Sequence, residues 1–97
     1  MALHHIVLFR FQPHATLEQR LKATEMLKAL GTDCGGYGLL LWKVGSNEDL
    51  RKGISLVQLS IFADRIALDT FKKHPKHKEV TDYIKDFTDW YVGDIHH

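Results

Sequence analysis

The chain has 97 residues, of which 44% are hydrophobic and 26% are charged, a composition typical of one small soluble domain with its own core. Its 13 basic and 12 acidic residues leave a formal net charge of +1, which does not favour a nucleic-acid-binding protein. No apolar run approaches the ~20 residues of a membrane span, so no membrane association is expected. Because the N-terminal segment lacks the features of a signal peptide and Cys34 is the one cysteine, we expect a cytoplasmic protein.

The first half of the chain predicts a strand, a helix and a second strand. Leu3 to Phe11 is apolar at both odd and even positions, which indicates a strand covered on both faces, with His4 and His5 on opposite sides. A capping box of Thr16 and Gln19 starts the helix. The helix is expected to end at Gly31 and to turn four residues inward: Leu17, Leu21, Thr24 and Leu27. Residues 38–44 form the second strand.

The second half predicts a strand, two helices and a short final strand. Residues 54–62 form the strand, and Asp64 is placed to cap the helix that follows. One face of this helix carries Ala67, Phe71 and His74, and Pro75 then ends it. The next helix has an inward stripe of His77, Val80, Ile84 and Phe87. Residues 90–95 close the chain, and His96 and His97 are left outside the candidate site.

This order of elements indicates a ferredoxin-like α+β fold, with a four-stranded antiparallel sheet and helices on one face. Such helices cover only one side of the sheet. The other side carries Ile6, Leu8 and alternate apolar residues of the second and third strands. A second copy of the same sheet is the simplest cover, so we predict a homodimer with two-fold symmetry.

Three segments of the sequence carry a family resemblance. They are HIVLF at residues 5–9, Gly45-Ser46-Asn47, and the pattern F-x-D-x-x-A-L-x-x-F-x-x-H-P-x-H from Phe62 to His77. Together they resemble the stress-responsive dimeric A/B barrel (Dabb) family, so residues 1–97 are expected to form one Dabb-type domain. The resemblance implies a dimeric α+β barrel, with a pocket between the sheet and the helices of each subunit.

The pattern is also similar to plant polyketide cyclases of the olivetolic acid cyclase type, which close a polyketide by an aldol step without a cofactor or metal. His77 matches the histidine that pairs with their catalytic tyrosine, and His5 matches a pocket histidine. The tyrosine itself falls at Phe71 and another pocket histidine at Leu56, so half of the constellation is retained. The resemblance therefore implies His77 and His5 as catalytic candidates. It implies a pocket lined by Leu56, Phe71, Val7 and Phe9.

Two functions stay open on this basis. One is a cofactor-free, cyclase-like or lyase-like enzyme in which His77, with His5, moves a proton on a small carbonyl compound, since imidazole titrates near ~6.5. The other is a non-catalytic stress-response or ligand-binding dimer, in which both histidines are hydrogen-bonded core residues. A quinone-type cofactor-independent monooxygenase shares the architecture, but no residue set here supports it.

The surroundings of the HPxH corner leave two further alternatives. His74 and His77 have a spacing that can hold a metal ion, but no carboxylate is fixed beside them by spacing. Four lysines surround the corner, at positions 72, 73, 76 and 78. They form either a solvated face or a rim that attracts an anionic substrate such as a carboxylate or a thioester.

Overall fold

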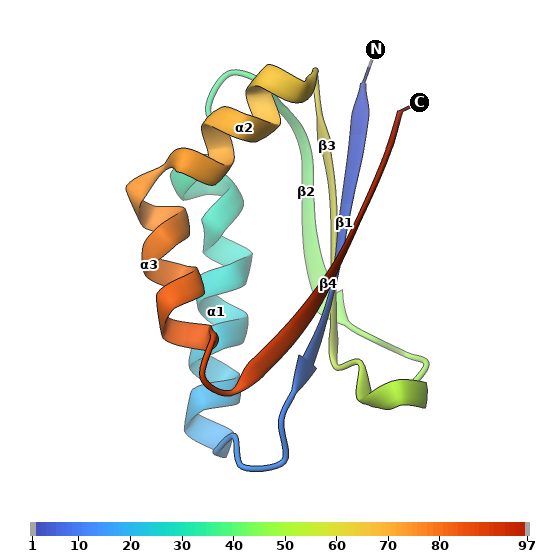
Figure 1. Cartoon of the computed structure of the whole chain (residues 1–97), viewed down its shortest axis with the longest axis vertical. Coiled ribbons are helices and arrows are strands. Elements are labelled where there is room, and N and C mark those ends of the chain that lie inside the picture. The colour runs from blue at the N-terminus through green and yellow to red at the C-terminus, as the bar shows by residue number, and fades with distance from the viewer. Residues whose placement is uncertain (1, 97) are drawn as a thin grey trace.

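The computed structural model describes residues 2–96 as a four-stranded antiparallel sheet with three α-helices on one face (Figure 1). The elements in chain order are β1 (Leu3–Phe11), α1 (Leu17–Cys34), β2 (Leu39–Ser46), the 3-10 turn η1 (Arg51–Gly53), β3 (Leu56–Phe62), α2 (Arg65–Lys73), α3 (Pro75–Ile84) and β4 (Thr88–His96). The strand order is β2-β3-β1-β4, and each neighbouring pair is antiparallel. This is the predicted ferredoxin-like arrangement, and the strand ends differ from the predicted ones by at most two residues.

Two positions lie outside the described residues, Met1 and His97, while His96 ends β4. None of the helices within residues 2–96 is long and apolar enough to cross a membrane.

Strand β1 occupies the middle of the sheet and separates the two faces. Its odd-numbered residues, from Leu3 to Phe11, are buried under the helices, whereas its even-numbered residues are half-buried on the opposite face. His5 therefore points toward the helices and His4 points away from them, as the alternation predicts.

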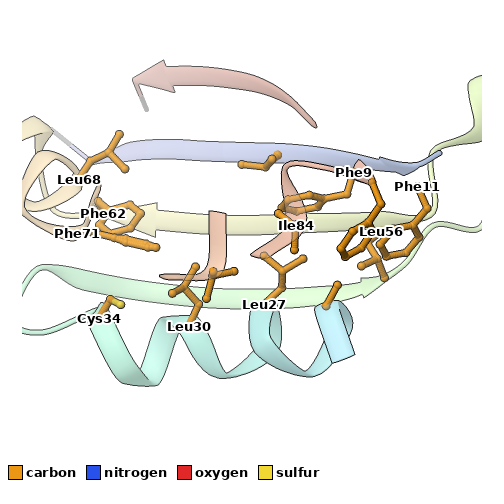
Figure 2. Close-up of a cluster of buried hydrophobic side chains, with 14 of the residues drawn as sticks. Phe9, Phe11, Leu27, Leu30, Cys34, Leu56, Phe62, Leu68, Phe71 and Ile84 are labelled. Carbon is orange, nitrogen blue, oxygen red and sulfur yellow. The ribbon is translucent and has the colours of Figure 1, made fainter. Parts of the chain in front are cut away.

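The core fills the space between the sheet and the helices (Figure 2). Phenylalanine and leucine side chains of β1 and β3 meet apolar residues from all three helices, among them Leu27, Leu68 and Ile84. Burying one such large side chain contributes about 1.5–3 kcal/mol, so this single layer supplies much of the stability of the fold.

Helix α1 corrects two expectations. Leu17 and Leu21 are 72% and 60% exposed, and the buried face instead follows Ala23, Leu27 and Leu30. The prediction gave weight to the large leucines, whereas small residues let this helix approach the sheet closely.

The predicted end of α1 at Gly31 is the second corrected expectation. The helix continues through Gly31 in helical conformation and ends at Cys34. A Cβ atom at Gly31 would lie 2.2 Å from Cγ of Trp42 on β2, so the glycine provides room for the indole ring.

The corner between α2 and α3 determines the direction in which the His77 side chain points. Asp64 caps α2 as predicted, since its carboxylate accepts from the Ala67 backbone N–H at 2.8 Å. His74 is exposed instead of lying on the buried face of α2, and its Nδ1 accepts from the Lys76 backbone N–H at 3.0 Å. His74 thus caps α3, and Pro75 occupies the first turn, where no hydrogen bond is lost. The new helix direction brings His77 to the side that faces the sheet.

The opposite face of the sheet has no helix over it within the described residues (Figure 1). Its apolar side chains come from all four strands: Ile6, Leu8, Leu41, Val57, Leu59, Ile61, Tyr91 and Ile95. This is the face that the sequence predicts to meet a second copy of the chain.

A candidate active site between the sheet and the helices

A cavity of about 170 Å³ lies between the sheet and the helices. Its walls are mainly apolar; the apolar residues come from β1, α1, α3 and β4, while β3 and α2 each add one polar residue. The polar side chains in the lining are His5, Gln58, Lys72, His77 and Thr81. An apolar protein cavity of roughly 150 Å³ accommodates benzene, so this volume suits a ligand whose apolar part is the size of one six-membered ring.

His5 is held in this cavity by the register of the sheet. It lies directly opposite Asp94 of β4, and opposed residues in an antiparallel pair extend their side chains to the same face. The His5 Nδ1 and the Asp94 Oδ1 are 2.5 Å apart, with the two side chains only 8% and 22% exposed. Because an ionised carboxylate only accepts, Nδ1 carries the proton in this bond, and Nε2 remains available for acid–base chemistry.

Further contacts fix the His5–Asp94 pair. Arg65 Nη1 lies 3.8 Å from the second carboxylate oxygen of Asp94 and balances its charge. On the other side, the Ser60 hydroxyl donates to the His5 carbonyl oxygen at 2.6 Å and accepts from the Gln58 amide at 3.3 Å. A buried polar group that is hydrogen-bonded in this way holds one orientation, as acid–base chemistry requires.

His77 enters the cavity from the first turn of α3. Its ring stands edge-on to the Phe71 ring, with centroids 5.0 Å apart and an interplanar angle of 83°. Burial lowers the pKa of His77 below its ordinary value, and the positive charges of His5 and Lys72 lower it further. His77 is therefore neutral at pH 7, which is the form that accepts a proton.

The residues expected at the site are placed in two groups. His5, Val7, Phe9 and His77 line the cavity. Leu56 and Phe71, which were expected to line it as well, do not.

Leu56 is paired with Phe9 and Ser46 along the sheet, and the cavity is lined instead by Gln58, two residues further along the same face. Phe71 packs against the rings of Phe62 and Trp42, with centroids 5.2 and 5.3 Å away. The Phe71 ring therefore packs against His77 but does not form part of the cavity wall.

Asp94 was missed by the sequence analysis. Residues 90–95 are expected to form the final strand, but the partner of His5 depends on which strands pair and in what register. One signal was present, because an acidic residue in an otherwise apolar strand is unusual unless it is paired.

Two other kinds of reactive site were considered among the described residues: a nucleophilic thiol and a cluster of metal ligands. Burial and the nearby Asp33 raise the pKa of the free thiol of Cys34, which makes it a poor nucleophile. Within residues 2–96, no three side chains of His, Cys, Asp or Glu gather as metal ligands would.

The model of the stress responsive A/B barrel domain, Dabb, matches residues 3–96. The chain belongs to the Dabb family. No curated protein sequence matches it.

Solved structures similar to this Dabb domain include proteins with different activities. A dimeric protein of unknown function with a ferredoxin-like fold from Bacteroides fragilis has a TM-score of 0.80 at 19% identity, covering 99% of this chain and 96% of its own. The hydroxynitrile lyase of Passiflora edulis has a TM-score of 0.80 at 18% identity, covering 97% and 91%. SnoaB, a cofactor-independent oxygenase from Streptomyces nogalater, has a TM-score of 0.76 at 12% identity, covering 99% and 92%. At these identities the similarity shows the common fold, which does not determine the reaction.

Proposed function

We propose that this Dabb domain is a cytoplasmic, homodimeric, cofactor-free enzyme of the cyclase/lyase-like class, which moves a proton on a small carbonyl compound. The observation that carries the proposal is the pair of imidazoles in one mainly apolar cavity, with His5 held by Asp94 and His77 kept neutral by burial. Two imidazoles that are held in one cavity by different contacts can divide the roles of proton acceptor and proton donor.

The two histidines take different roles in this scheme. The neutral His77 removes a proton from the carbon beside the carbonyl group. His5, whose ring is held by the Asp94 carboxylate, donates a proton from Nε2 to the carbonyl oxygen. The product is an enol, whose carbon attacks a second carbonyl group to form a carbon–carbon bond. His5 recovers its proton from the enol oxygen, and His77 gives its proton to the oxygen of the attacked carbonyl, which becomes a hydroxyl group. The reverse sequence breaks the same bond. Phe71 has no hydroxyl group, so a tyrosine takes no part.

The homodimer is supported by the apolar sheet face that no helix covers. Burial of apolar surface contributes about 25 cal/mol per Å², so two such faces gain stability by packing on each other. The Bacteroides fragilis protein with this fold is described as dimeric, which is consistent with such packing.

A second candidate is a dimer that binds a small ligand without changing it. The packing of His77 against Phe71 favours this alternative, because a histidine in that position also stabilises the core. The two candidates differ in whether His77 is needed for turnover.

Deuterium exchange at the α-carbon of small ketones, such as acetylacetone and acetophenone, tests the proposal by NMR in D2O. The variant His77→Gln should lose about 10²–10⁴-fold in the exchange rate, the usual contribution of a general base. Asp94→Asn should also be slower, because the amide no longer holds the His5 ring in the same tautomer and orientation.

His14→Gln is the matched control, since His14 is an exposed histidine in the loop before α1 and does not line the cavity. It should exchange at the wild-type rate. Equal rates in wild type and His77→Gln, with both proteins folded and dimeric, would leave the non-catalytic ligand-binding dimer as the better account.

A further inference from the structure

Lys72 brings a positive charge to the edge of a cavity that is otherwise mainly apolar. It lies in the last turn of α2 and lines the cavity together with His77. No aspartate or glutamate is among the residues that line this cavity. Within residues 2–96, the ammonium group of Lys72 also has no carboxylate at ion-pair distance.

The neighbouring lysines of the HPxH corner differ from Lys72. Lys76 Nζ lies 3.4 Å from Glu79 on its own helix, and Lys78 Nζ lies 2.7 Å from Asp82. These two charges are compensated on the outer surface of α3. Lys72 and Lys73 are both exposed, but of the two only Lys72 lines the cavity.

Asp94, the acidic partner of His5, is not available to Lys72. Asp94 is already bonded to His5 and balanced by Arg65. The positive charge of Lys72 therefore faces a cavity with no anion of its own. Its proximity to the reactive group is independently indicated by its contribution to the lowered pKa of His77.

We propose that the substrate is a small oxo-carboxylic acid whose carboxylate pairs with Lys72 and whose apolar body fills the cavity beside His77. The chemical step rests on the proposed function, whereas the carboxylate site rests on Lys72 and the cavity. One lysine supplies a single positive charge, which matches a carboxylate better than a phosphate with two charges. The volume of about 170 Å³ limits the body of the ligand to the size of one six-membered ring.

This placement orients the substrate for proton transfer. With the carboxylate at Lys72 and the apolar part inside, the chain carbons between them lie next to His77, which also lines the cavity. Lys72 is a specificity-determining residue in this arrangement, because it selects the charged ligand over a neutral one of the same shape.

Binding of benzoate and of benzamide, its neutral isostere, tests the carboxylate site. The probes are titrated separately into the wild-type protein at low salt, and the ring resonances of His5 and His77 are followed by NMR. Wild type should bind benzoate about tenfold more tightly than benzamide, the scale of one charge-assisted hydrogen bond. Lys72→Met should bind both ligands equally, and Lys73→Met is the matched control that should keep the preference.

Three results would overturn the carboxylate assignment. In the first, Lys72→Met still prefers benzoate. In the second, Lys73→Met loses the preference to the same extent as Lys72→Met. In the third, the wild type binds benzamide as tightly as benzoate. The α-proton exchange of ketones is measured on the same samples. Retained exchange without a benzoate preference refutes only the carboxylate site. A benzoate preference that depends on Lys72, without any exchange, refutes only the proposed catalysis.

Discussion

The substitution Gly31→Ala sets two physical effects against each other. Alanine in the interior of a helix is favoured over glycine by up to ~1 kcal/mol, which alone would stabilise α1. The new Cβ, however, would lie 2.2, 2.5 and 2.6 Å from three ring atoms of Trp42, much closer than carbon atoms approach each other. The indole must therefore move.

The indole has little freedom to move. Trp42 Nε1 donates to the Leu27 carbonyl oxygen at 3.2 Å, and the ring stands edge-on to Phe71 with centroids 5.3 Å apart. Overpacking of this kind typically costs about 1–3 kcal/mol, and a weakened hydrogen bond adds about 0.5–1.5 kcal/mol. After the gain in helix propensity, we expect a net loss of about 2 kcal/mol. In a domain of this size that loss lowers the melting temperature by roughly 8–16 °C.

Urea unfolding followed by circular dichroism, at one fixed protein concentration, measures the effect. Ala29→Gly is the control, because it changes helix propensity at an exposed position of α1 and should lose about 1 kcal/mol. The substitution Trp42→Leu removes the indole ring. In a Trp42→Leu background, Gly31→Ala should therefore cost less stability than it does in the wild type. A Gly31→Ala protein as stable as wild type, or more so, would refute the close packing of Gly31 against the Trp42 ring.

Four other outcomes are expected. Because burial lowers the pKa of His77 in the folded state, the unfolded chain binds more protons there, so the urea midpoint should fall as the pH decreases below about 6.5. A His77→Phe variant with the same pH dependence would contradict this. Leu8→Asp should reduce the mass in sedimentation from twice the 11.2 kDa chain toward a single chain, whereas Lys28→Asp should not; a wild-type monomer would contradict the dimer. Asp64→Ala should lower stability by about 1 kcal/mol in urea unfolding, through loss of the α2 cap, and no change would argue against the cap. Cys34 should react with a thiol reagent only on unfolding, because the thiol is buried with a raised pKa, and rapid labelling of the native protein would refute this.

Local chemistry in the sequence was sufficient for the order of elements and for several of their ends. Thr16 with Gln19, and Asp64, cap their helices as predicted, because a capping residue bonds to backbone groups only three positions away. The alternation along β1 likewise placed His5 and His4 on opposite faces. The family resemblance added His77 and His5 as candidates, and both line the cavity.

Contacts between distant parts of the chain decided the rest. Asp94 became the partner of His5 through the pairing of β1 with β4, which joins residues 89 positions apart. An acidic residue in an apolar strand indicates that it has a partner, but the sequence does not indicate which residue that partner is. The sequence predicts that Gly31 ends a helix. In the structure Gly31 lies within the helix, and the missing side chain leaves room for the ring of Trp42. Four lysines around one corner are equivalent in the sequence, and only the packing of α2 and α3 over the sheet places Lys72 at the cavity. Local hydrogen bonds are thus encoded within a few residues, whereas the composition of a site depends on which surfaces the fold brings together.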